Sequence, residues 1–279
     1  MSNLILSAFA DEYADGTGDQ LEGLNRFGIK YLEVRHLDGV NLAKLPLEAV
    51  REAKKAMNSA EIRVSALGSP LGKIPLDGDL DAHLETARHL FEAAKILETD
   101  YVRIFSFYAP EGASVAEKRS EVFAALEPLV LLARQYGLVL CHENEAKIYG
   151  DLPQRCREIA EYFAGEVKCV FDMGNFVLEG VDPWAAYETL KEHIAYFHIK
   201  DALAAGAIVP PGKGEAKIGQ ILSAHRKVAG KDFFVSLEPH LQTFSGRNAL
   251  VGRSFENPYQ YPDAKTAFAD AVKKFKEII

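Results

Sequence analysis

Short apolar runs alternate with longer amphipathic stretches along the chain, and this alternation repeats eight times. The apolar runs predict β-strands at Leu4–Ala10, Tyr31–His36, Ile62–Leu67, Tyr101–Phe107, Leu138–Glu143, Val167–Asp172, Ile194–Ile199 and Phe233–Glu238. The stretches between them show helical spacing and predict helices at Asp19–Phe27, Leu47–Ala60, Asp79–Leu97, Ser114–Tyr136, Leu152–Phe163, Pro183–His193, Ile218–Val228 and Asp263–Ile279.

Eight strand–helix units indicate parallel strands joined by crossover helices. The strands are almost continuously apolar, as expected for strands that are buried on both faces. We therefore predict an α/β fold, a single (β/α)8 barrel in one domain over residues 1–279, with long loops at 202–216 and 240–261 on its functional face. An open doubly wound sheet is the main alternative, but the first strand leads into ADEYADGTG and not into a GxGxxG phosphate loop.

Composition limits the classes of partner. The 279 residues are 48% hydrophobic, which is ample for one large core, and the net charge is 32 − 40 = −8. An acidic chain argues against a nucleic-acid-binding surface, which usually carries excess Lys and Arg. The odd number of cysteines, without a CxxC pair, favours reduced thiols and a cytoplasmic location. The first residues lack the features of a signal peptide, and no apolar run approaches the roughly 18 residues that suggest a membrane span.

Four potential metal ligands stand at the ends of the last four predicted strands: Glu143, Asp172, His198 and Glu238. In a (β/α)8 barrel the carboxyl ends of all strands meet at one mouth, where active sites lie. Strand alternation allows each of the four side chains to point into the barrel, whereas His142 has the opposite parity and should face the helices. Three carboxylates and one imidazole suit Mn²⁺, Mg²⁺, Co²⁺ or Zn²⁺. Any one of them alone could be an ordinary cap or core residue, but their joint placement predicts a metal site for an oxygen-rich substrate.

The strings CHEN, FDMGN, HIKD and LEPH contain these residues, and their order and spacing resemble the sugar phosphate isomerase/epimerase family of xylose isomerase-like TIM barrels. VPPGKGEAKIGQIL resembles the family's Gly-x-Gly loop, and LEVRHLDGVNL resembles its second-strand segment. The likeness runs from the first strand to the last helix. The strings are specific for the superfamily, but none is specific for one substrate.

The resemblance implies that Glu143, Asp172, His198 and Glu238 bind one divalent metal ion, and that the two glutamates also form an acid/base pair. Isomerising or epimerising a hydroxy-ketone requires removal of a proton beside the carbonyl, which leaves an enediolate that a metal can stabilise as a Lewis acid. The expected function is that of a metal-dependent isomerase or 3-epimerase of a ketose or ketose phosphate, in carbohydrate metabolism.

Three further side chains are candidates for substrate binding. Lys200 shares the strand face of His198 and could orient substrate or balance the carboxylates. Asn175 could hydrogen-bond sugar hydroxyls or simply shape its loop. His240 stands two residues beyond Glu238 and could approach the metal or the substrate.

The second and fourth strands and the glycine-rich loop add other candidates. Arg35 shares a strand face with Glu33, either as an ion pair or as a substrate contact, and Arg103 is expected to pair with a carboxylate of the barrel. Gly212 and Gly214 allow close backbone approach, so their amides could hold a phosphate or only shape the loop.

Other functions stay open at this point. A dehydratase of a keto-inositol or keto-acid would share the first chemical step, and DALAAGAIVPPGKG lacks the Arg that family epimerases often carry after the HIKD string. An enzyme like endonuclease IV would need more histidines: the chain has Asn175 where that pattern has His. A non-catalytic sugar-binding barrel is a third alternative. We expect a small sugar or sugar phosphate as partner, no nucleic acid and no membrane. The sequence leaves the choice of sugar, the native metal and a homo-oligomer open.

Overall fold

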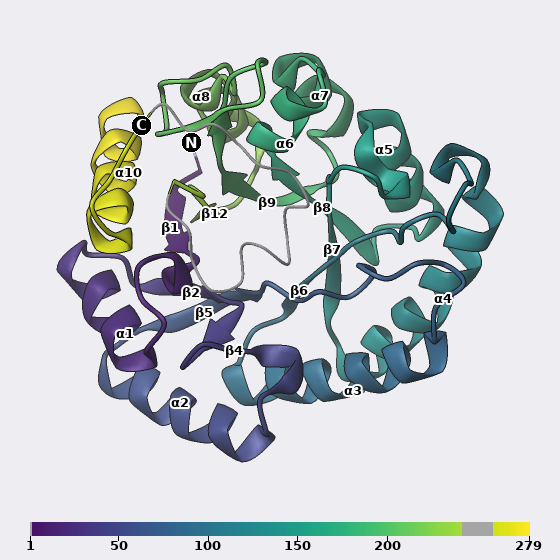
Figure 1. Cartoon of the computed structure of the whole chain (residues 1–279), viewed down its shortest axis with the longest axis horizontal. Helices are drawn as coiled ribbons and strands as arrows, with labels where there is room; N and C mark the ends of the chain where they lie inside the picture. The colour runs from purple at the N-terminus through teal and green to yellow at the C-terminus, as the bar shows by residue number, and fades with distance from the viewer. Residues whose placement is uncertain (1, 242–258) are drawn as a thin grey trace.

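The computed structural model describes residues 2–241 and 259–279. Eight parallel strands form a closed barrel, in the order β1-β12-β9-β8-β7-β6-β5-β2 (Figure 1). This confirms the predicted (β/α)8 barrel. The strands are β1 (Leu4–Ala8), β2 (Tyr31–Val34), β5 (Arg63–Leu67), β6 (Tyr101–Ile104), β7 (Val139–Glu143), β8 (Val167–Asp172), β9 (Ile194–Ile199) and β12 (Phe233–Leu237).

Helices surround the strands as an outer ring (Figure 1). Their starts follow local sequence signals: Asp79, Asp182 and Asp263 each accept a backbone hydrogen bond as the N-cap. Gly137, with a φ of 65°, ends the fourth helix in the left-handed conformation that glycine adopts without strain. The helices that follow the barrel strands are α1 (Thr17–Arg26), α2 (Leu47–Ser59), α3 (Leu80–Leu97), α4 (Arg119–Tyr136), α5 (Pro153–Tyr162), α7 (Pro183–Leu190), α8 (Ile218–Val228) and α10 (Ala264–Ile278).

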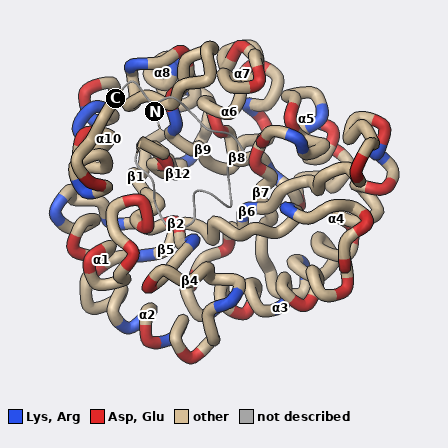
Figure 2. Tube along the Cα trace, in the orientation of Figure 1, with Lys and Arg blue, Asp and Glu red and all other residues tan. Residues whose placement is uncertain are grey.

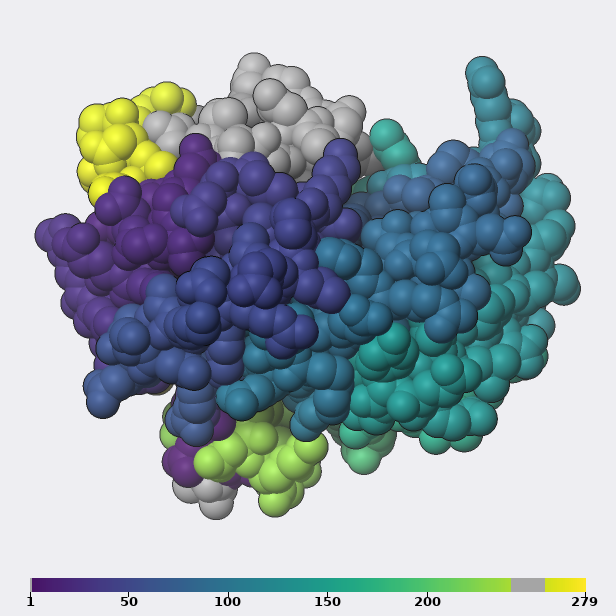
Figure 3. All heavy atoms as spheres, turned by 90° about the horizontal axis from the view of Figure 1, so that it is seen from below, coloured from purple at the N-terminus to yellow at the C-terminus, as the bar shows by residue number. Residues whose placement is uncertain are grey.

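The barrel closes where β1 pairs with β12, in a register that matches Leu4 with Phe233 and Ala8 with Leu237. The backbone N–H of Asn3 donates to the carboxylate of Asp232 just before these strands begin. In the side view, the start of the chain (purple) and the segment leading into β12 (lime) lie together at one end of the molecule (Figure 3). The carboxyl ends of the parallel strands, and with them the candidate site, lie at the opposite end.

Several predicted strands and helices were too long, because short 3₁₀ turns occupy their ends. The first strand stops at Ala8 and gives way to a 3₁₀ turn, and the predicted helix at Ser114 begins only at Arg119, after another such turn. Short elements that the pattern did not predict are η1 (Ala10–Glu12), η2 (Leu42–Lys44), η3 (Val115–Glu117), η4 (Tyr149–Asp151), α6 (Met173–Leu178), and the hairpins β3 (His36–Leu37) with β4 (Val40–Asn41) and β10 (Asp201–Ala202) with β11 (Ile208–Val209). The predicted loop 202–216 thus contains part of a hairpin. Most of the other, residues 242–258, lies outside the described residues.

The main hydrophobic core lies between the strands and the helix ring, and a smaller cluster around Cys141, Val170 and Tyr196 fills the barrel interior below the site. Cys141, Cys156 and Cys169 are free thiols, as predicted, and all three are buried. Acidic and basic residues are interspersed around the helix ring (Figure 2). Among the described helices, none combines the length and the apolar character needed to cross a bilayer.

Candidate metal centre

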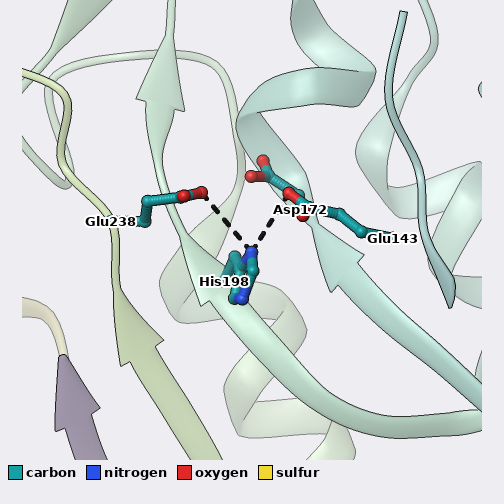
Figure 4. Close-up of side chains that lie close together, drawn as sticks. All are labelled: Glu143, Asp172, His198 and Glu238. Atoms are coloured by element: carbon teal, nitrogen blue, oxygen red, sulfur yellow. Dashed lines mark hydrogen bonds and ion pairs between the residues drawn. The ribbon is translucent and has the colours of Figure 1, made fainter. Parts of the chain in front are cut away.

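The four strand-end residues meet at the mouth of the barrel (Figure 4). One ligand atom of each of Glu143, Asp172, His198 and Glu238 lies within 4.8 Å of those of the other three. The barrel register brings them together, since Asp172 on β8 stands opposite His198 on β9, and β12 delivers Glu238 directly after its last residue. None of the four is more than 2% exposed, so their charges act in a medium where water screens them weakly.

His198 is at the centre of this group. Its Nδ1 lies 3.1 Å from Oε1 of Glu143 and 3.4 Å from Oε2 of Glu238. Its Nε2 points the other way and lies 3.2 Å from each carboxylate oxygen of Glu33 on β2. The two ring nitrogens therefore face two different sets of carboxylates.

The ammonium group of Lys200 bridges two of the candidate ligands, Asp172 and Glu238. Its Nζ lies 2.8 Å from Oδ2 of Asp172 and 3.1 Å from Oε2 of Glu238, and it also donates to Oδ1 of Asn175 at 3.1 Å. The ammonium group thus donates hydrogen bonds to Asp172 and Asn175 and forms an ion pair with Glu238. Lys200 shares the inward face of His198, as strand parity predicted.

Two arginines, Arg103 and Arg35, contact the carboxylates of the candidate site. Arg103 on β6 places Nη1 3.1 Å from Oε2 of Glu143 and 3.6 Å from Oε1 of Glu238. Arg35, directly after β2, donates to the same Oε1 of Glu238 at 2.9 Å. The ring of Phe9 lies against both guanidinium groups, with centroid distances of 4.4 Å to Arg35 and 5.3 Å to Arg103. The predicted pairing of Arg103 with a barrel carboxylate is confirmed.

Two acids of η1 belong to the same network, and the sequence pattern did not identify them. Arg35 donates to both oxygens of Asp11, at 2.8 and 3.1 Å, and lies 3.5 Å from Glu12. His36 contacts Asp11 at 2.9 Å. The signal that could have found them is their position, since both acids follow the first strand at the mouth of the barrel.

His240 approaches the site as the sequence suggested. Its Nε2 lies 3.4 Å from Oε1 of Glu12 and 3.6 Å from Oε1 of Glu238, and its backbone N–H donates to Glu12 at 2.7 Å. Burial raises the pKa of Glu12 to about 8, with further contributions from the Glu238 and Asp11 charges that Arg35 opposes.

Burial and neighbouring charges act in opposite directions on the pKa values of the candidate ligand carboxylates. Burial alone would raise the pKa of Glu143, but His198 and Arg103 outweigh it and lower that pKa to about 2. Burial raises the pKa of Asp172 to about 6, against the opposing charge of Lys200. The two carboxyl groups therefore differ in their affinity for a proton although they lie side by side.

Burial disfavours the charged form of His198, yet the carboxylates of Glu33, Glu143 and Glu238 raise its pKa well above the ordinary value. Nδ1 of His198 is the ring nitrogen that faces Glu143 and Glu238. A metal ion that binds Nδ1 must displace its proton, so ion binding and proton release are coupled.

Of the remaining predicted residues, Asn175 lies in the site, whereas Gly212 and Gly214 contact Asp201. The side chain of Asn175 donates to the backbone oxygen of Asn144 at 2.9 Å and approaches Oε1 of Glu143 at 3.4 Å. Gly212 and Gly214 donate their N–H groups to Oδ2 of Asp201, at 2.8 and 2.9 Å. Their amides thus hold the loop onto Asp201, and their interpretation as a phosphate cradle gains no support.

His142 lies outside the barrel interior, as its parity predicted. Its Nε2 contacts the hydroxyl of Ser106 at 2.9 Å, and the same hydroxyl accepts from the N–H of Gly150. His142 therefore anchors the loop after β7, next to the candidate ligand Glu143 in the sequence but turned away from it.

The donor set fits a divalent cation. Three carboxylates and an imidazole nitrogen converge from four neighbouring strands, and oxygen-rich sites with one histidine suit Mn²⁺, Mg²⁺, Co²⁺ or Zn²⁺. Oε2 of Glu143 and Oε2 of Glu238 are buried and accept no hydrogen bond among the described residues, although cationic side chains lie near both. An ion would supply the bonds that these oxygens lack.

Comparison with known protein families gives one family match, to the family described as xylose isomerase-like TIM barrel, over residues 21–261. The chain belongs to this family. The match includes seven of the eight barrel strands and all four strand-end residues. No curated protein matches the chain.

Solved structures with the same barrel cover almost the whole chain. A D-allulose 3-epimerase from Methylomonas sp., in complex with D-allulose, has a TM-score of 0.76 at 14% identity and covers 100% of this chain and 98% of its own. The probable 3-DHS dehydratase AsbF from Bacillus anthracis has a TM-score of 0.75 at 17% identity, with 99% of both chains covered.

A third similar structure is the IOLI protein with a bound zinc atom, with a TM-score of 0.72 at 20% identity; it covers 98% of this chain and 97% of its own. At these identities the likeness shows the fold. Since one fold hosts many reactions, the function must be argued from the site itself.

Proposed function

We propose that the protein is a divalent-metal-dependent isomerase or 3-epimerase of a ketose or ketose phosphate, and that it acts by proton abstraction beside a carbonyl group. One observation carries this proposal. Glu143 and Glu238 reach the metal-ligand cluster from different strands, β7 and β12, and both contact Nδ1 of His198. Two carboxylates on either side of one site are what the removal and the return of a proton require.

The residues Glu143, Asp172, His198 and Glu238 would hold the ion. When bound, a divalent cation supplies positive charge at the substrate oxygens, where negative charge develops as the proton leaves. The family membership and the zinc atom in the IOLI protein support this assignment.

Side chains of the protein would transfer the proton and orient the substrate. One of the two glutamates, in its ionised form, takes the proton from the carbon beside the carbonyl. In an epimerase the other glutamate, in its protonated form, returns a proton to the opposite face of that carbon. In an isomerase a proton is returned to the neighbouring carbon, while the hydroxyl proton passes to the former carbonyl oxygen. Arg103 contacts both side chains and holds them in place. Asn175 and Lys200, which lie beside the ligands, and His240 and Arg35, on the opposite side, are proposed to contact or orient the substrate hydroxyls.

Glu143 and Glu238 lie in the same group of buried charges. The pair titrates as a unit, so a pH profile would report on both together. Glu238 contacts more cationic groups than Glu143 does, namely Lys200, Arg35 and Arg103. This asymmetry gives the two carboxylates different environments, as a base and an acid need.

Solvent exchange tests the proposal. The protein is loaded with Mn²⁺ and incubated in D₂O with a panel of ketoses and ketose phosphates, and the deuterated carbon is located by NMR. Deuterium at C1 identifies an aldose–ketose isomerase, and deuterium at C3 identifies a 3-epimerase. Protein treated with a chelator is the control. Absence of exchange with every sugar in the panel would contradict the proposal.

A dehydratase of a keto-inositol or keto-acid is the second candidate. The specific observation in its favour is Lys200, whose buried ammonium group lies 3.1 Å from Glu238 and would place a positive charge beside a departing hydroxide. The absence of Arg from residues 201–214 points the same way. Incubation with keto-inositols and keto-acids distinguishes a dehydratase from an isomerase or epimerase, because a dehydratase releases water and leaves a product with a new double bond.

A further inference from the structure

We propose that Glu33 is a positioning residue that fixes the imidazole of His198, so that the ring binds the metal through Nδ1. The inference rests on the proposed function only in that the site holds a divalent ion. It assigns to Glu33 a role different from the ion pair or substrate contact that the sequence suggested.

The two ring nitrogens of His198 are already divided between two partners. Both carboxylate oxygens of Glu33 lie 3.2 Å from Nε2. Nδ1 faces Glu143 and Glu238, at 3.1 and 3.4 Å. A nitrogen that donates its hydrogen to a carboxylate has no lone pair for a metal, so the ring can offer only Nδ1 to the ligand cluster.

Glu33 is itself held rigidly. It is fully buried on β2, and the hydroxyl of Tyr196 donates to its Oε1 at 2.9 Å. Tyr196 precedes His198 by two residues on β9, so its side chain lies one layer deeper in the barrel. Glu33 therefore approaches the imidazole from below, on the side away from the barrel mouth where a substrate would enter.

Packing fixes the plane of the ring. Phe9 meets the imidazole of His198 edge-on at 5.2 Å between centroids, and Tyr196 does so at 5.5 Å. With the ring plane set by these contacts and the proton on Nε2 held by Glu33, Nδ1 faces the cluster before any ion arrives, and a bound ion takes the place of its proton. Removing such a second partner of a metal-binding histidine typically costs about 10–100-fold in metal affinity.

The test compares the wild type with Glu33→Gln, Glu33→Ala and Tyr196→Phe. Zn²⁺ affinity is measured by competition with a chromophoric chelator, and the metal-bound nitrogen is identified by NMR of protein labelled with ¹⁵N-histidine and loaded with ¹¹³Cd²⁺. Asp151→Asn is the matched control, because it makes the same carboxylate-to-amide change outside the barrel, where Asp151 pairs with Arg155.

We expect ¹¹³Cd coupling to Nδ1 of His198 in the wild type, with a proton on Nε2. Glu33→Gln should weaken Zn²⁺ binding by about tenfold and Glu33→Ala by about 100-fold, with a smaller loss for Tyr196→Phe and none for Asp151→Asn. The amide keeps a hydrogen-bond acceptor and the shape of the side chain, so Glu33→Gln remains informative if Glu33→Ala does not fold.

Coupling to Nε2 in the wild type would overturn the inference, as would Glu33 variants that bind Zn²⁺ as tightly as the wild type. A lower unfolding temperature with unchanged affinity and coupling would show a merely structural role and would also overturn it. These outcomes leave the proposed reaction intact. A wild-type protein that binds no divalent ion would contradict both the role of Glu33 and the proposed metal-dependent reaction.

Discussion

Arg103 contacts Glu143 at the mouth of the barrel, with Nη1 3.1 Å from Oε2 and both side chains no more than 3% exposed. The same Nη1 lies 3.6 Å from Glu238, so one guanidinium group lies between the two proposed proton-transfer residues. Because a buried charge that loses its partner is costly, Arg103→Leu should lower the free energy of unfolding of the metal-free protein by roughly 3–5 kcal/mol.

Urea denaturation with and without Mn²⁺ measures this effect. Added metal should recover part of the loss, since the ion supplies positive charge to the same carboxylates. The control is Arg134→Leu, which removes an exposed pair with Glu166 and should leave the unfolding midpoint nearly unchanged. Equal effects of the two substitutions would show that Arg103 does not balance the buried carboxylates.

Replacement of Lys200 by Met should make the protein more dependent on metal. The ammonium group now lies between Asp172 and Glu238, so its removal leaves two ligand carboxylates facing each other without that cation. We expect a lower unfolding temperature without metal and a larger rise on adding Mn²⁺ than in the wild type.

Thermal unfolding at several Mn²⁺ concentrations provides the measurement for Lys200. Lys191→Met is the matched control, since its partner Glu188 lies on the protein surface. If metal stabilises Lys200→Met no more than it stabilises the wild type, the ammonium group does not compete with the ion for these carboxylates.

The pH dependence of stability should include a contribution from His225, far from the barrel mouth. Its ring packs against Phe197 and Phe233, each at 4.8 Å, and burial lowers its pKa to about 4. The unfolded chain takes up this proton near pH 6.5, whereas the folded protein does not until about pH 4. The folded state therefore loses stability as the pH falls through this window.

His225→Phe should reduce this loss, because a phenyl ring fits the aromatic surroundings and takes up no proton. The check is the urea midpoint at pH 7 and at pH 4.5 for both proteins. The difference between the two pH values should be smaller in the variant. An equal or larger difference would show that the ring of His225 is not buried in its neutral form.

The fold could be predicted because the signals are local. A barrel strand needs a short apolar run and a crossover helix needs one apolar face, and both can be recognised within a few residues. The same logic identified Glu143, Asp172, His198 and Glu238, since strand parity and strand ends are local properties. Boundaries were less predictable: at Ala10–Glu12 a 3₁₀ turn replaces the end of the predicted first strand.

The partners of these residues could not be predicted, because they depend on barrel closure. Glu33 and His198 are separated by 165 positions in the chain and meet only across the barrel. Arg35 reaches Glu238 across 203 positions. No local pattern encodes such pairs, whereas Asp11 and Glu12 could have been found from their position directly after the first strand.

The central claim is that Glu143 and Glu238 transfer the proton at a metal site, and substitution of each by Gln tests it most directly. Deuterium exchange and turnover are measured with the sugar that the wild type accepts, at Mn²⁺ concentrations that saturate each variant, and Glu166→Gln on the surface is the control. Both site variants should bind the sugar yet lose about 10²–10⁴-fold in turnover, with exchange abolished in the one that lacks the base. Turnover and exchange at wild-type rates in both variants would contradict the account.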